Sequence, residues 1–235
     1  MRSFRTTTGP VRTRPYYEDK EIERICSGAL EQSGYLPNKP GPISIDRFIE
    51  KHFQVRIIFE KLPSGILGYT EFGPKGVVAV HVAEPADRTP AAERRVSSTL
   101  AHEGGHGLMH AHLFALGDDH KTLFGSDPDV SATKVLCRDG ETELARPKGQ
   151  RTYDGRWWEF QANRAIGALL LPQSLFLSFM EAFTERRGTF GAPFLPDQRR
   201  TEAIRAAAET FDVNPAAAKV RVDMFFPAGS QQLTL

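Results

Sequence analysis

The sequence predicts an α+β fold, in which one small sheet is accompanied by helices over most of the chain. Three short runs with strand character follow one another between residues 55 and 83. On both sides of this region, apolar residues recur at helical spacing. The 235 residues, 40% of them hydrophobic, are enough for one medium domain with at most a small helical appendage.

The composition argues against several classes of protein. Lys and Arg number 30 against 29 Asp and Glu, so the net charge of +1 gives no electrostatic case for binding nucleic acid or a membrane surface. No apolar run approaches the roughly 20 residues that span a bilayer. The two cysteines, Cys26 and Cys137, form no spaced framework, which favours a reducing compartment over a disulfide scaffold. We therefore expect a cytoplasmic protein, with residues 1–16 as a disordered basic tail.

Two helices and the small sheet are predicted in the first part of the chain. Helical spacing predicts one helix from about 18 to 33 and a shorter one over 44–52. Strand patterns follow over 55–60, 66–72 and 77–83, separated by turns rich in Gly and Pro. Because the connections are short, we expect the sheet to be mostly antiparallel.

A long helix is predicted next, with Thr89 as its cap and Pro90 in its first turn. Residues 115–153 are polar and aperiodic, so we expect them to be an inserted loop or lid. Two further helices are expected from about 154 to 172 and from 173 to about 186.

The chain therefore divides into a core over residues 17–190 and a C-terminal helical unit over 195–228. In this unit the segment FDVNP separates two helices. Asn214 is expected to cap the last helix and Pro215 to occupy its first turn.

The long helix carries the segment HEGGH, which matches the HExxH metal-binding motif. Positions i and i+4 share one helix face, so the imidazoles of His102 and His106 can reach one ion. Glu103 is turned by about 100° from His102. This places its carboxylate beside the ion, where it can act as a base on water.

Three glycines within and after this motif distinguish a metal site from a pair of solvated histidines. Gly104, Gly105 and Gly107 each cost roughly 1 kcal/mol relative to Ala in a helix interior. An exposed helix gains nothing from that cost. Close approach of a strand or a substrate to the helix would explain it, and we therefore favour the metal site.

A catalytic zinc ion requires a third protein ligand and an open position. Glu159 is the best candidate because it lies in an apolar segment beside Trp157, Trp158 and Phe160. A carboxylate buried there needs a partner, since an unpaired buried charge is costly. Ala162 would leave room for a neighbouring helix, and Asn163 could hydrogen-bond a metal ligand.

Other positions for the third ligand remain open on sequence alone. Glu159 could instead lie on the solvent side of an amphipathic helix. The other candidate ligands are His110, His112, Asp118, Asp119 and His120.

The segments AHEGGHGLMH and EFQANRAIGALLLP resemble the ImmA/IrrE metallopeptidase family, which has an AHExGH helix and a second helix with an ExxAN motif. The likeness extends over roughly residues 18–225 and implies a zincin-like core with a helix-turn-helix-like C-terminal unit. It implies His102, His106 and Glu159 as ligands and Glu103 as catalytic base. The interval between His106 and Glu159 is longer than we expect for the family.

The resemblance implies a zinc-dependent endopeptidase, although Mn²⁺ or Fe²⁺ would also suit these ligands. A zinc ion so held lowers the pKa of water to about 7, and Glu103 would take the proton. Tyr153, Arg164 and His110 are candidates for stabilising the oxyanion. The strand at 77–83 is expected to be the sheet edge that binds an extended substrate.

Family members act on repressors of the helix-turn-helix type, so we expect a protein substrate of that class and no membrane partner. One alternative is a DNA-binding regulator that uses residues 197–225. The last helix offers only Lys219 and Arg221 as cations, which favours a role in packing or substrate docking. Another is a pseudo-enzyme that acts as a sensor or binding partner, with Cys137 as a possible redox residue.

Overall fold

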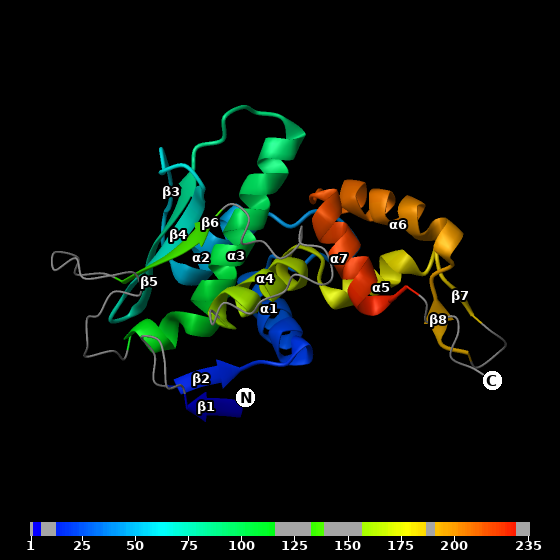
Figure 1. Ribbon diagram of the computed structural model, residues 1–235, viewed down its shortest axis with the longest axis horizontal. Helices are drawn as coiled ribbons and strands as arrows, with labels where there is room; N and C mark the ends of the chain where they lie inside the picture. Colours follow the sequence, from blue (N-terminus) through cyan, green and yellow to red (C-terminus); the bar gives the residue numbers. More distant parts are fainter. Residues whose placement is uncertain (1, 6–12, 116–132, 139–156, 187–190, 229–235) are drawn as a thin grey trace.

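Helix α3 (Pro90–Ala115) lies between a four-stranded sheet and helix α4 (Trp157–Leu170) in the computed structural model of the chain (Figure 1). The structure describes residues 2–5, 13–115, 133–138, 157–186 and 191–228. Within this part the fold is α+β, as the sequence predicts. No helix in the described ranges is both long and apolar enough to cross a membrane.

The remaining described helices pack around α3 and α4 or around one another. Helix α1 contacts α4, α2 contacts α3, and α6 and α7 form a pair beside α4 (Figure 1). They are α1 (Asp19–Ser33), α2 (Ile45–Phe53), α5 (Gln173–Met180), α6 (Asp197–Thr210) and α7 (Pro215–Phe225).

Local sequence signals set several helix ends. The Thr89 hydroxyl accepts a hydrogen bond from the backbone N–H of Ala92 at the start of α3. The Asn214 side chain does the same for Ala216 in α7. Both predicted caps are therefore confirmed. Helix α1 ends at Gly34, whose φ of 74° lies in the left-handed region.

The sheet has the strand order β3-β5-β4-β6. Strand β4 pairs antiparallel with both β5 and β6, whereas β3 pairs parallel with β5, so the sheet is mostly antiparallel. The strands are β3 (Ile57–Glu60), β4 (Ile66–Gly73), β5 (Gly76–Ala83) and β6 (Thr133–Arg138).

Two expectations about this sheet are wrong. The predicted edge strand, β5, lies between β3 and β4 and not at the edge of the sheet. The chain reverses direction after β3 and again after β4, so β5 runs parallel to β3 and pairs with it. Residues 133–138 belong to the stretch 115–153 that was expected to be a loop, but they form β6. The rest of that stretch after residue 115 lies outside the described residues.

The predicted tail and the predicted helix after residue 173 also differ from the structure. Strands β1 (Arg2–Arg5) and β2 (Thr13–Tyr16) pair as an antiparallel hairpin, where a disordered tail was expected. A tertiary contact that composition does not reveal holds this segment, because the Pro15 carbonyl accepts a hydrogen bond from Gln161. Helix α5 ends at Met180, and the chain continues into β7 (Glu185–Arg186), which pairs with β8 (Pro193–Phe194).

Helices α3 and α4 approach closely at Gly105. A Cβ atom at this position would lie 2.7 Å from the Cβ of Ala165 and 3.2 Å from the Cα of Ala162. At Gly107, a Cβ would lie 2.5 Å from the ring of Phe53 in α2. The close approach inferred from the glycines is therefore real, but the neighbours are a helix and a phenylalanine rather than a strand or a substrate. Ala162 leaves room for the neighbouring helix, as predicted.

The C-terminal helices are attached to the core by a buried ion pair. The guanidinium of Arg221, only 2% exposed, donates to both carboxylate oxygens of Glu23 in α1 and to the carbonyl of Leu171. These hydrogen bonds satisfy a charge that would be costly to leave unpaired. Arg221 thereby links α7 to α1 and to the end of α4.

We predict that Gly105→Ala destabilises the protein by about 1–3 kcal/mol, because the added methyl group overlaps α4. Gly104→Ala is the matched control: its Cβ would lie 3.5 Å from Leu169, an ordinary contact. That change should leave stability within about 1 kcal/mol of the parent. Urea denaturation measures both variants. Equal destabilisation by the two substitutions would contradict the close α3–α4 contact.

Candidate metal centre

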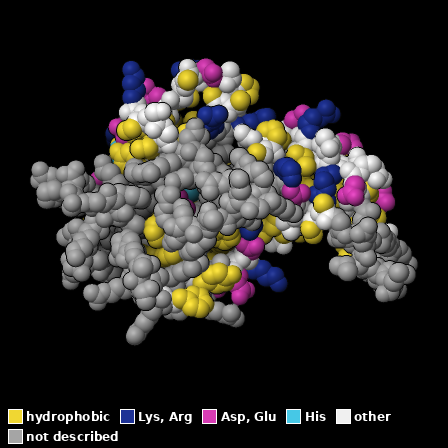
Figure 2. Space-filling view, in the orientation of Figure 1, with side chains coloured by type: hydrophobic (Ala, Val, Ile, Leu, Met, Phe, Trp, Pro, Cys, Tyr) yellow, Lys and Arg dark blue, Asp and Glu magenta, His cyan; other side chains and the backbone are white. Residues whose placement is uncertain are grey.

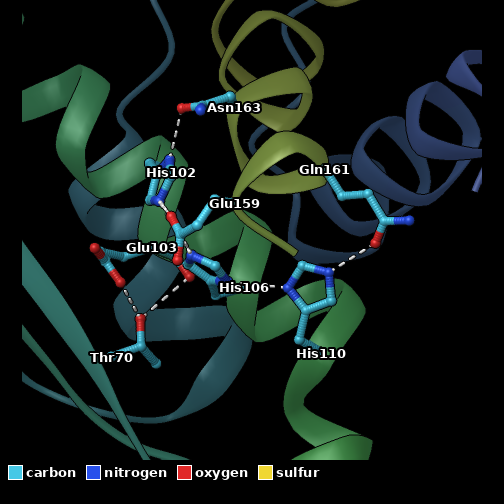
Figure 3. Close-up of polar contacts among 8 residues, drawn as sticks. All are labelled: Thr70, His102, Glu103, His106, His110, Glu159, Gln161 and Asn163. Carbon is cyan, nitrogen blue, oxygen red and sulfur yellow. Dashed lines mark hydrogen bonds and ion pairs between the residues drawn. The ribbon is translucent and has the colours of Figure 1, made fainter. Parts of the chain in front are cut away.

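Three ligand atoms converge between α3 and α4 (Figure 3). The Nε2 atom of His102 lies 3.0 Å from Nε2 of His106 and 3.1 Å from Oε2 of Glu159. The distance from Nε2 of His106 to Oε2 of Glu159 is 3.5 Å. A tetrahedral zinc site with bonds of about 2.0–2.1 Å has edges of about 3.3 Å. The three atoms thus form one face of a site of the right size.

Helix geometry explains this convergence. His102 and His106 are one turn apart on α3, and Glu159 in the first turn of α4 faces them. All three side chains are buried. The sequence-predicted ligands are therefore brought together, and this buried group can bind a metal ion.

Electrostatics within the group favour an ionised Glu159. Burial alone would raise the pKa of this carboxyl group, but the electrostatic interaction with His106 and hydrogen bonds from His102 and His106 hold the pKa well below its usual range. Burial opposes the charged form of His102, yet its hydrogen bond and charge interaction with Glu159 leave the His102 pKa raised. Burial lowers the pKa of His106, so this imidazole favours its neutral form.

Two carboxylate oxygens fit the presence of an ion or water in this centre. Oε1 of Glu159 and Oε1 of Glu103 are both buried, and neither has a hydrogen-bond partner within the described part of the chain. Buried polar atoms normally have a partner. A metal ion in the centre, together with the water bound to it, would supply partners to these oxygens.

Asn163 orients the first histidine ligand, as predicted. Its Oδ1 atom lies 3.0 Å from Nδ1 of His102 (Figure 3). When Nδ1–H donates to this oxygen, the lone pair of Nε2 is directed to the metal position. Asn163 therefore fixes the tautomer that a metal ligand requires.

The Glu103 carboxyl group lies beside the three ligand atoms, on the side of the sheet that carries Thr70 (Figure 3). The Thr70 hydroxyl, on β4, donates to Oε2 of Glu103 over 2.5 Å. Burial raises the pKa of Glu103 to about 8, while His102 and the Thr70 hydrogen bond act in the opposite direction. A carboxyl group with a raised pKa beside the ligands suits a general base.

Sequence reasoning missed Thr70 and the glycine that lets it approach. A Cβ on Gly68 would lie 2.7 Å from the carbonyl oxygen of His81 and 2.8 Å from Cγ2 of Thr99. Gly68 and Thr70 are two apart in β4 and share a sheet face. Two small residues at positions i and i+2, on the same face of the strand, were the available signal for close packing against α3.

The candidates for stabilising an oxyanion receive little support. Both ring nitrogens of His110 are engaged, with His106 at 3.0 Å and Gln161 at 2.9 Å. Burial, and then the charge of His106, lower the His110 pKa to about 3. Arg164 lies against Asp19 and the ring of Phe160. The described centre thus assigns none of these groups to the oxyanion.

Among the described residues, one further sequence candidate does not join the cluster. His112 is exposed on α3. The remaining candidates fall outside the residues or side chains that the structure describes: Asp118, Asp119, His120, the side chain of Cys137, and Tyr153.

Comparison with known proteins adds no assignment. No protein-family model matches the chain, and no curated protein sequence matches it.

We predict that zinc binding to the metal-free protein near pH 7 releases about one proton or more. The pKa of Glu103 is raised to about 8 and that of His102 is also raised, so both shifts favour the protonated forms of these groups. A metal ion displaces the His102 proton, so zinc affinity should rise as pH rises. Calorimetry in two buffers with different protonation enthalpies measures the release. Affinity that is independent of pH between about 6 and 8 would contradict this assignment.

Proposed function

We propose that the chain is a zinc-dependent endopeptidase. The observation that supports this most strongly is the buried triangle of His102, His106 and Glu159, with the Glu103 carboxyl group beside it but outside the ligand set. Three ligands and an adjacent carboxylate are the arrangement expected of a catalytic zinc site rather than a closed structural one. Two imidazoles and a carboxylate also suit Mn²⁺ and Fe²⁺. The HExxH motif, in which Glu103 follows the first ligand, favours zinc.

The proposed chemistry divides between the ion and the chain. When bound, zinc supplies Lewis acidity, which acidifies water and polarises the carbonyl group to be attacked. Glu103 accepts the proton of the attacking water and can deliver it to the leaving amine. The Thr70 hydroxyl holds one oxygen of Glu103, so the other, Oε1, is left to take the proton.

The substrate class comes from the resemblance of the two helix motifs to the ImmA/IrrE family. We propose a protein substrate, specifically a transcriptional repressor of the helix-turn-helix type. The two segments that carry this resemblance, AHEGGHGLMH and EFQANRAIGALL, lie in α3 and in the facing helix α4.

An extended substrate can bind by main-chain pairing to an unpaired strand edge. Strand β5 has neighbours on both sides, so it does not offer one. Among the described strands of this sheet, β3 and β6 are at the edges. We assign substrate pairing to β6, because it contacts α3 and adjoins β4, which carries Thr70.

The described contacts of α7 give less support to a DNA-binding function. Of the two cations in this helix, Arg221 is buried against Glu23, and Lys219 pairs with Asp223. Figure 2 shows basic and acidic side chains interspersed over the C-terminal helices on this face. Phosphate binding usually uses a cluster of available cations. A role for α7 in packing fits these contacts better.

The test combines zinc content with proteolysis. We predict about one zinc ion per chain in the parent, and its loss in His106→Ala. Glu103→Gln should retain zinc but lose hydrolysis by about 10²–10⁴-fold, because only the base is removed. Elemental analysis gives the metal content, and mass spectrometry of new protein N-termini in a cell extract gives the cleavage products.

His112→Ala is the matched control, because this histidine lies on the same helix but is exposed and outside the cluster. It should keep both zinc and activity. A zinc-loaded parent that yields no more new N-termini than Glu103→Gln would contradict the peptidase proposal and favour a sensor or binding partner.

A further inference from the structure

The ring nitrogen of His106 that faces away from the metal position, Nδ1, forms a hydrogen bond that has no role in the proposed peptidase chemistry. This Nδ1 atom lies 3.0 Å from Nδ1 of His110, and Nε2 of His110 lies 2.9 Å from Oε1 of Gln161. Nε2 of Gln161 in turn lies 3.0 Å from the carbonyl oxygen of Pro15. Figure 3 shows the histidine pair and Gln161 in line beside the metal centre. A continuous chain of hydrogen bonds thus runs from a ligand to the N-terminal hairpin.

The direction of this chain is determined at its far end. A backbone carbonyl can only accept, so Gln161 directs its NH₂ group to Pro15 and its oxygen to His110. That oxygen can only accept as well, so the Nε2 atom of His110 carries the proton. In neutral His110, Nδ1 is then an acceptor, and Nδ1 of His106 donates to it. The lone pair on Nε2 of His106 is thereby directed to the metal position.

Burial makes any reversal of the chain costly. His106 and His110 have no exposed surface, Gln161 is 2% exposed, and Pro15 is also buried. The ring of Trp157 packs edge-on against His110, with the ring centroids 5.6 Å apart. Water is therefore not available to replace a mismatched partner, and two donors or two acceptors facing each other would remain unsatisfied.

We propose that His110 and Gln161 are positioning residues that fix the tautomer and ring orientation of His106. The Pro15 carbonyl sets the direction of this chain of hydrogen bonds, which we call the relay. The proposal rests on the metal centre of the proposed function. His110 contacts His106 at Nδ1 and not at the Nε2 atom that faces the metal position, and Gln161 contacts His110 and Pro15. Their effect is on how well His106 binds the ion, and through Pro15 they connect this ligand to the N-terminal segment.

The first experiment reads the relay directly in the parent protein. In ¹⁵N-histidine-labelled protein, long-range ¹H–¹⁵N NMR correlations report which ring nitrogen carries the proton. We expect His106 protonated at Nδ1 and His110 protonated at Nε2, in both the metal-free and the zinc-loaded protein. His110 protonated at Nδ1, or at both nitrogens, would overturn the proposal.

The second experiment measures zinc affinity by competition with a chromophoric chelator. His110→Phe removes the acceptor for His106 and should weaken zinc binding by about 10–100-fold, a typical effect of losing such a partner. Gln161→Glu should weaken it similarly, because it sets an acceptor against the Pro15 carbonyl. His110→Gln retains a donor and an acceptor, so it should restore affinity to within a few-fold of the parent.

His112→Phe is the control, because it makes the same change on the same helix at an exposed position outside the relay. Parent-like affinity in both His110→Phe and Gln161→Glu would overturn the proposal. If the parent protein binds zinc but hydrolyses no protein, the peptidase proposal is contradicted and the proposal for His110 and Gln161 is not. The NMR result tests the relay whether or not the chain is a peptidase, so the two failures can be distinguished.

Discussion

The close contact between α3 and α4 at Gly105 is the constraint on which the rest of the centre depends. Only at this separation can Glu159 reach His102 and His106, which it approaches to 3.1 and 3.5 Å. The same contact brings Asn163 to His102 and Gln161 to His110. One helix thus delivers a ligand and the hydrogen-bond partners of two histidines. The helix-propensity cost of Gly105 is offset by this set of polar contacts.

The centre concentrates ionisable groups where water is excluded, and its energetics follow from that burial. Glu103, His106 and His110 have no exposed surface. Each needs a partner, because an unsatisfied buried group costs about 1–3 kcal/mol or more. Thr70 supplies one to Glu103, and Gln161 supplies one to His110. A divalent cation would stabilise the remaining negative charge on Glu159, so metal binding and the stability of this core are linked.

Sequence patterns within one segment were sufficient to predict those features that depend on interactions within a single helix or at its ends. Helical spacing and apolar context predicted the cluster of His102, His106 and Glu159, and the i+4 position identified Asn163. The caps at Thr89 and Asn214 follow from the same kind of signal. What the sequence did not reveal depends on pairing between distant segments: β5 in the sheet interior, β6 as a strand, Thr70 against Glu103, and Pro15 against Gln161. No periodicity in one segment specifies its partner in another.

The proposed chemistry depends on one metal ion at the triangle formed by His102, His106 and Glu159 between α3 and α4. Diffraction from crystals of the zinc-loaded protein, recorded on both sides of the zinc absorption edge, tests it most directly. We expect one anomalous peak per chain at about 2.0–2.2 Å from Nε2 of His102, Nε2 of His106 and a carboxylate oxygen of Glu159. A peak bound by any other set of side chains, or none at this position, would contradict it.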